Sequence, residues 1–311
     1  MKEAKTSLKC PRVVLLAFAA CAVATVCAHA QTLERVFIKG SRLAYGGYVV
    51  TRAVDEHSGE SRAVIKRGGR ELARLTDGAP RDYATRIGLF PFFGGKGRQL
   101  VVEQYTGGAH CCTVYRVYDL GPELRLLFDG DEFGIDEIGE DMNVVDIDRD
   151  GRYEFTLSVM AFDYFLTSHA NSVFPTAVFA YDEGSGKYVS ANLKFSAYLL
   201  RDIERDIAKV EALNRRMTKK ERASTFHGEH FRAVMDVFLK YEYAGQAQKG
   251  WDFFASHYLQ PDKVEVSNEA VKKLNSSAIY RFANHVIPEF EIPVDERPSA
   301  VNLKESVGGE R

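Results

Sequence analysis

Hydrophobic and polar residues alternate along the first part of the chain, up to about residue 195. Short runs rich in β-branched and aromatic residues are separated there by glycine and aspartate turns, a pattern typical of half-buried strands. No long helical pattern interrupts these runs, so we expect a largely antiparallel sheet. No internal repeat of fixed period stands out, although the region is compatible with one weak blade-like unit. The predicted strands are 35–38, 43–53, 61–67, 99–105, 113–120, 124–128, 153–161, 176–181 and 187–190.

Between residues 197 and 283 the apolar residues recur at a period close to 3.6, which indicates amphipathic helices. Two apolar stripes flank Gly245, and the second ends at Pro261, so we predict a helical hairpin that turns near Gly245. A last helix is predicted over 268–285, and the proline-punctuated tail 288–311 is predicted to be disordered.

These patterns predict the α+β fold class. An antiparallel β-rich domain, built as a sandwich or a partial propeller, would span 31–195, and a small helical domain would span 196–287.

Residues 1–30 have the pattern of a secretory signal peptide: four basic residues, a fifteen-residue apolar run and Ala28-His29-Ala30 as a cleavage signature. We therefore expect cleavage before Gln31 and a periplasmic or secreted protein. A retained anchor is less favoured, because a membrane span needs about twenty apolar residues. A lipid anchor at Cys21 is also less favoured, since Phe18 fits the first lipobox position poorly. We expect no transmembrane segment in the mature chain.

Removal of this leader changes the charge and the cysteine content. The leader carries four basic residues and one acidic residue, so the net charge of −2 becomes −5, which argues against nucleic acid as the partner. Two of the five cysteines then remain, Cys111 and Cys112, so the chain is not a disulfide-stapled scaffold.

The segment from Asp146 to Glu154 carries the clearest chemistry. Carboxylates stand at loop positions 1, 3, 5 and 9, which are Asp146, Asp148, Asp150 and Glu154, and Gly151 at position 6 permits a sharp turn. Alternate oxygen ligands on a tightly curled loop suit Ca²⁺, which takes six to eight oxygens. Mg²⁺ is less favoured because it retains several waters. The alternative is a solvated acidic turn held by side-chain-to-backbone hydrogen bonds.

This loop departs from an EF-hand, because position 12 is Leu157 and no helices flank it. A loop that closes at position 9 and runs into a strand resembles the calcium loops of FG-GAP and VCBS-type repeats in integrin-like β-propellers. The resemblance implies Asp146, Asp148, Asp150 and Glu154 as side-chain ligands, with the backbone carbonyl of Arg152 as a fifth. Glutamate at position 9 departs from the more usual aspartate.

The adjacent cysteines in Gly107-Gly108-Ala109-His110-Cys111-Cys112 have three interpretations. They form a strained vicinal disulfide, remain two buried thiols, or form a soft-metal or redox site with His110. This segment, the acidic loop and the aromatic run 162–165 together resemble a group of uncharacterised bacterial secreted proteins, over about residues 88–195. The resemblance implies export and a β-rich domain, and it implies no activity.

We therefore expect an exported calcium-binding module that binds a protein or glycan of the cell envelope, rather than an enzyme. The alternative is a hydrolase of a cell-envelope polymer, with Asp163, Asp136 and Glu137 in acid–base roles. Asp163 is also interpreted as a turn cap. The pair His227 and His230 has a spacing that suits a metal, but we expect surface histidines.

Overall fold

A computed structural model describes residues 31–33, 36–54, 57, 60–76, 85–105, 113–134 and 137–283. The predicted signal peptide 1–30 and tail 288–311 lie outside these residues, as do His110, Cys111, Cys112 and Asp136. The predictions made for them are not addressed by the structure.

In the described residues, the β-rich part forms three antiparallel sheets, each built on a meander of four consecutive strands, and a fifth, short strand joins the third sheet. The first comprises β2 (Arg42–Tyr45), β3 (Tyr48–Val54), β4 (Ser61–Arg67) and β5 (Arg70–Thr76). The second comprises β6 (Arg86–Phe90), β7 (Gln99–Tyr105), β8 (Thr113–Leu120) and β9 (Leu124–Asp129). The third comprises β10 (Ile138–Val145), β11 (Glu154–Val159), β12 (Thr176–Asp182) and β13 (Lys187–Ser190), with β1 (Gln31–Thr32) paired to the β10 edge.

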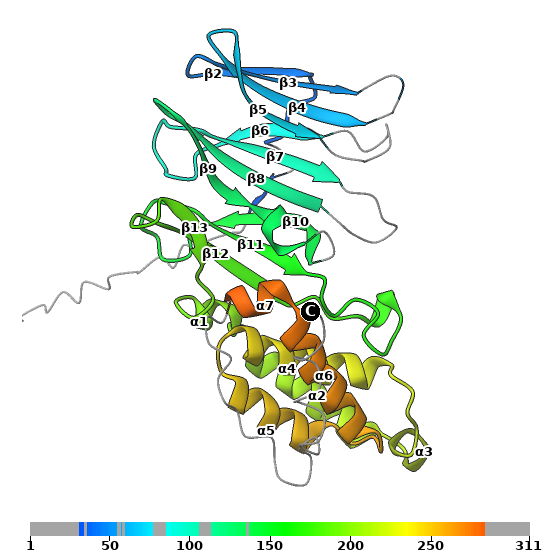
Figure 1. Cartoon of the computed structure of the whole chain (residues 1–311). Helices are drawn as coiled ribbons and strands as arrows, with labels where there is room; N and C mark the ends of the chain where they lie inside the picture. Colours follow the sequence, from blue (N-terminus) through cyan, green and yellow to red (C-terminus); the bar gives the residue numbers. More distant parts are fainter. Residues whose placement is uncertain are drawn as a thin grey trace, which may run out of the picture.

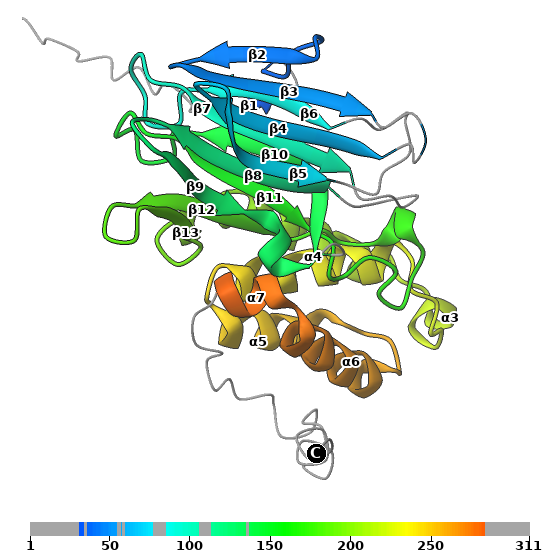
Figure 2. The ribbon, with the colours of Figure 1, turned by 45° about the horizontal axis from the view of Figure 1, so that its top comes forward.

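The three meanders are stacked face to face, and the helices lie beneath the third (Figures 1 and 2). Each sheet is built from consecutive strands, as a propeller blade is, whereas sandwiches exchange strands between their two sheets. The α+β class is confirmed, and the partial propeller describes the stack better than the sandwich does.

Successive apolar side chains along a strand point to opposite faces of its sheet and pack in the spaces on either side of it. Leu100 and Val102 of β7 belong to the apolar cluster shared with the first meander, while Val101 between them belongs to the cluster shared with the third. On the opposite face of the third meander, Val178 packs in a cluster with Phe195 and Leu199 at the start of the helical part. The apolar core therefore continues through the sheets into the helices.

The helical part contains the predicted hairpin. Helices α4 (Glu229–Tyr243) and α5 (Ala247–His257) pack against each other, and Gly245 between them has φ of +71°, a conformation that favours glycine. The predicted last helix is instead two helices, which meet at Ser277. The helices are α1 (Ser196–Leu199), α2 (Ile203–Arg216), α3 (Lys219–Arg222), α4 (Glu229–Tyr243), α5 (Ala247–His257), α6 (Lys263–Ser276) and α7 (Ala278–Ala283).

Several strand predictions are wrong. The run 43–53 is a hairpin of two strands, because Gly46 and Gly47 both have positive φ and form its turn. Strands β5, β6 and β10 had no counterpart among the predicted strands. In place of the predicted strand 35–38, the described residues 36–38 contain an isolated bridge between Phe37 and Gly88.

Candidate metal centre

The acidic loop joins two paired strands of the third meander. Val145 at the end of β10 pairs with Glu154 at the start of β11, and Val144 pairs with Phe155. Both valines and Phe155 are almost completely buried, so the two ends of the loop are fixed by the sheet. The residues between them have to turn within a short span, which brings their side chains close together.

The turn is made by backbone conformations and by local hydrogen bonds. Arg149 has φ of +63° and Gly151 has φ of +88°. The backbone N–H of Gly151 donates to Oδ2 of Asp146 at 3.1 Å, and the N–H of Arg152 donates to Oδ1 of Asp150 at 2.7 Å. The glycine at position 6 thus permits the sharp turn expected of it.

Three of the predicted ligands converge. One carboxylate oxygen from each of Asp146, Asp148 and Glu154 lies within 4.8 Å of the others. Oδ1 of Asp146 is buried and makes no hydrogen bond. Glu154 is only 4 % exposed, and its Oε2 accepts a hydrogen bond from the N–H of Ile147 at 2.8 Å. A buried acceptor without a partner is costly, so this cluster favours a cation.

The negative charges of the three carboxylates are only partly neutralised by nearby cations. Burial raises the pKa of Glu154 to about 7, and the nearby Asp148 carboxylate contributes to the increase. The ammonium of Lys194, 2.7 Å from Oδ2 of Asp148, lowers the pKa of Asp148. Lys194 comes from the segment after β13 and partly neutralises the cluster.

The other two predicted ligands, Asp150 and Arg152, do not join this group of side chains. Asp150 accepts the hydrogen bond of the turn described above, and the Arg152 guanidinium pairs with Glu183 at 2.6 Å on the surface. The resemblance assigned Arg152 a role only through its backbone carbonyl. The cluster that the structure brings together is therefore Asp146, Asp148 and Glu154.

The β6–β7 turn of the second meander contacts the acidic loop. The N–H of Tyr153 donates to the carbonyl of Phe92 at 2.8 Å, and a Cβ added to Gly94 would overlap the carbonyl oxygen of Gly151. The Gly94-Gly95 pair is visible in the sequence as a turn, but its contact with the loop is not. Lys194 likewise carries no sequence signal that connects it to the cluster.

The acids considered for hydrolysis have other partners. Glu137 accepts hydrogen bonds from the hydroxyl of Ser277 at 2.7 Å and from the N–H of Ala278 at 3.2 Å, at the start of α7. Asp163 accepts from the N–H of Tyr164 at 2.9 Å and lies 2.8 Å from Nδ1 of His169. Glu137 thus connects the β-rich part to a helix, and Asp163 stabilises a turn.

The prediction that His227 is a surface residue is wrong. Its side chain is 13 % exposed and lies 2.7 Å from Oδ2 of Asp262, and its Nδ1 lies 2.6 Å from the carbonyl of Leu166. His230 is half-buried and points away from this pair toward Asn214. The two histidines therefore have separate environments and do not form the metal pair that their spacing allows.

No protein-family model, curated protein or solved structure matches the chain. The arguments for its function therefore come from the geometry of its own residues. No helix in the described part of the chain combines the length and the apolar character needed to cross a membrane.

Proposed function

We propose that the loop from Asp146 to Glu154 binds Ca²⁺, and that the protein is an exported module whose β-rich part is stabilised by this ion. The observation that carries the proposal is the convergence of three carboxylates around the buried, unpartnered Oδ1 of Asp146. Asp146, Asp148 and Glu154 would hold the ion through their side chains. The resemblance to FG-GAP and VCBS-type loops adds Asp150 and the Arg152 carbonyl as candidates for the remaining positions.

The chemistry of the ligands supports Ca²⁺. All three donors are carboxylate oxygens, which hard cations prefer, and an irregular loop suits the variable coordination geometry that Ca²⁺ accepts and Mg²⁺ does not. A divalent charge would also offset the repulsion between Asp148 and the buried Glu154. Lys194 supplies only one positive charge, and it is bonded to Asp148, the exposed member of the cluster.

The test is a thermal and calorimetric titration of the mature protein with CaCl₂ after treatment with EDTA. Saturating Ca²⁺ at about a hundred times Kd should stabilise the protein by about 2.7 kcal/mol and raise its Tm. Asp146→Asn removes the charge with little change in shape, and it should abolish the response. Asp182→Asn is the matched control, because Asp182 caps the exposed β12–β13 turn through Ser185 at 2.6 Å.

The stability of Asp146→Asn in EDTA separates loss of binding from loss of folding. It should equal or exceed that of the parent protein, because one of three crowded carboxylates has been neutralised. Equilibrium dialysis that detects no Ca²⁺ uptake by the parent at millimolar concentration would contradict the proposal. So would a Ca²⁺ response in Asp146→Asn as large as that in Asp182→Asn.

We further propose that the stacked meanders form a rigid platform for a protein or glycan of the cell envelope, with recognition through their loops. The bonds of Glu137 to the start of α7 weigh against the alternative of a hydrolase that uses this acid. Sedimentation with purified envelope, in Ca²⁺ and in EDTA, tests the binding role. Co-sedimentation that requires Ca²⁺ in the parent and is lost in Asp146→Asn is the expected result.

A further inference from the structure

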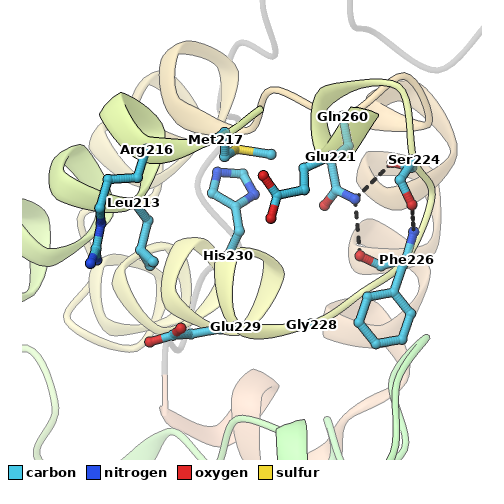
Figure 3. A pocket seen from close by; sticks show the side chains of 10 residues that line it. All are labelled: Leu213, Arg216, Met217, Glu221, Ser224, Phe226, Gly228, Glu229, His230 and Gln260. Atoms are coloured by element: carbon cyan, nitrogen blue, oxygen red, sulfur yellow. Dashed lines mark hydrogen bonds between the residues drawn. The ribbon is translucent and has the colours of Figure 1, made fainter. Parts of the chain in front are cut away.

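A cavity of about 380 Å³ lies in the helical part, remote in sequence from the acidic loop. It is bounded by α2, α3, the first turn of α4 and the segment that follows α5 (Figure 3). Its walls include the apolar side chains of Leu213, Met217 and Phe226. A volume of this order is sufficient for a small organic molecule.

Gln260 presents an acceptor to this cavity. The residue is 5 % exposed, and its Nε2 donates to the carbonyls of Ser224 at 2.8 Å and Phe226 at 3.0 Å. These two bonds fix the amide so that Oε1 points toward Glu221 and His230 in Figure 3. Oε1 is buried and has no hydrogen-bond partner. A buried amide oxygen without a hydrogen bond costs free energy, so a bound molecule that donates a hydrogen bond to it would be stabilised.

His230 presents a second acceptor. Nδ2 of Asn214 donates to the carbonyl of His257 at 3.1 Å, which turns Oδ1 of Asn214 toward Nε2 of His230 at 2.7 Å. Nε2 also lies 3.3 Å from the carbonyl of His257, so it faces two acceptors and carries the hydrogen. Burial lowers the pKa of His230 and favours the neutral ring. Its Nδ1 is therefore an acceptor. It is buried beside the side chain of Gln260, whose approach partly opposes the fall in the pKa of His230, and Nδ1 and the Gln260 Oε1 make no hydrogen bond because both are acceptors.

Glu221 adds a negative charge to the same wall. Its Oε2 accepts from the N–H and the hydroxyl of Thr218, at 2.7 Å and 2.8 Å, as part of a capping box. These bonds lower the pKa of Glu221, so the group is a carboxylate at neutral pH. Figure 3 shows its carboxylate between His230 and Gln260, while Arg216 and Glu229 point away from them.

We propose that this cavity binds a small primary alkylammonium ion. The N–H groups of the ammonium would donate to Oε1 of Gln260 and Nδ1 of His230, and Glu221 would supply the opposite charge. The alkyl chain would pack against Leu213, Met217 and Phe226. An anion is disfavoured because the two buried acceptors have no hydrogen to donate to it and the carboxylate would repel it. The charge of Arg222 also acts on His230, but its guanidinium donates to the carbonyl of Asn214 at 2.8 Å. This site is independent of the proposed calcium loop.

Calorimetry with n-butylammonium chloride tests the proposal directly. The comparison compounds are n-butyltrimethylammonium, which keeps the charge and the chain but has no N–H, and n-butanol, which keeps the chain without the charge. We expect saturable millimolar binding of n-butylammonium and binding weaker by about tenfold or more for both comparison compounds, since each loses at least about 1.4 kcal/mol of polar interaction.

Two variants distinguish the site from general charge attraction. Glu221→Gln should weaken n-butylammonium binding by about fivefold or more, because it removes the exposed carboxylate that lines the cavity. Glu229→Gln removes the same charge from a residue that points away, and it should leave binding within about twofold of the parent. Thermal melting of both variants verifies that they are folded.

Three results would overturn the proposal. The first is failure of n-butylammonium to saturate the protein by about 50 mM, which would mean that water satisfies the two acceptors. The second is equal affinity for the quaternary ion, which would exclude donation to Gln260 and His230. The third is equal weakening by Glu221→Gln and Glu229→Gln.

Discussion

The stability of the helical part should depend on pH through one carboxyl group, that of Glu242. This residue lies on α4 and is completely buried, and the hydroxyl of Tyr280 on α7 donates to its Oε2 at 2.6 Å. Burial raises the pKa of Glu242 to about 7, while the bond from Tyr280 partly opposes the increase. The group therefore takes up a proton when the chain folds near pH 6.

The sign and size of the effect follow from linkage. The pKa of Glu242 is higher in the folded state than its ordinary value of 4.5 in the unfolded state. Below pH 4.5 the carboxyl is protonated in both states, so its ionisation does not reduce the free energy of unfolding. Stability then falls as the pH rises, and the full penalty is present above pH 7. A gap of about 2.5 pH units corresponds to about 3 kcal/mol, and about 2 kcal/mol of this falls between pH 5 and pH 8.

Glu242→Gln removes the titration and keeps an amide oxygen as an acceptor for Tyr280. The absolute stability of the variant includes the cost of burying the amide group, so the informative quantity is its change with pH. Between pH 5 and pH 8 the variant should gain about 2 kcal/mol relative to the parent. Urea unfolding, followed through the fluorescence of the single tryptophan, buried Trp251 on α5, measures this change.

The control is Glu229→Gln, which removes an exposed carboxyl from the same helix and leaves Glu242 to titrate. It should keep the pH dependence of the parent. If Glu242→Gln and the parent differ by the same free energy at pH 5 and pH 8, the reasoning about Glu242 is refuted.

Three further substitutions test other contacts. Gly94→Ala should destabilise the protein by about 2 kcal/mol and weaken Ca²⁺ binding, because Gly94 has φ of +70° and the added Cβ would displace the Gly151 carbonyl. Denaturant unfolding measures the stability and calorimetry measures the affinity, and values equal to those of the parent would contradict the packing argument. Lys194→Met should tighten Ca²⁺ binding about fivefold, because it removes a cation bonded to Asp148; unchanged affinity would mean that the ammonium does not compete. Glu137→Ala should cost about 1–3 kcal/mol, measured by urea unfolding, because two donors at the start of α7 lose their acceptor; a loss below about 0.5 kcal/mol would show that they are readily satisfied elsewhere.

Strands with regular alternation could be predicted from the sequence, and those without it could not. Strand β5 is exposed along most of its length and carries little apolar signal. Strand β6 contains Gly88, where a side chain would collide with the backbone of Val36, so its glycine reflects a tertiary contact that sequence periodicity does not reveal. The sequence also did not reveal that the four-strand meander occurs three times. The middle sheet is buried on both faces and the first sheet on one, so equivalent strands need different patterns of apolar residues.

The candidate metal cluster could be predicted because its members lie within nine consecutive positions. Turn geometry alone brings Asp146 and Glu154 together across the paired ends of two strands. Lys194 and Gly94 come from other hairpins, so only the folded arrangement places them beside the loop. The cavity around Gln260 was missed for the same reason, since its acceptors belong to segments thirty residues apart.

The pairing of β1 with β10 has a consequence for how the protein is produced. Gln31 and Thr32 lie opposite Val144 and Asn143 in the antiparallel pair, and Leu33 is buried in the core beside them. Truncating the chain within this segment, or fusing a bulky tag directly before it, would leave the outer side of β10 open to pairing with another molecule. Self-association of such preparations would then arise at the strand that leads into the acidic loop, and a flexible spacer ahead of Gln31 should prevent it.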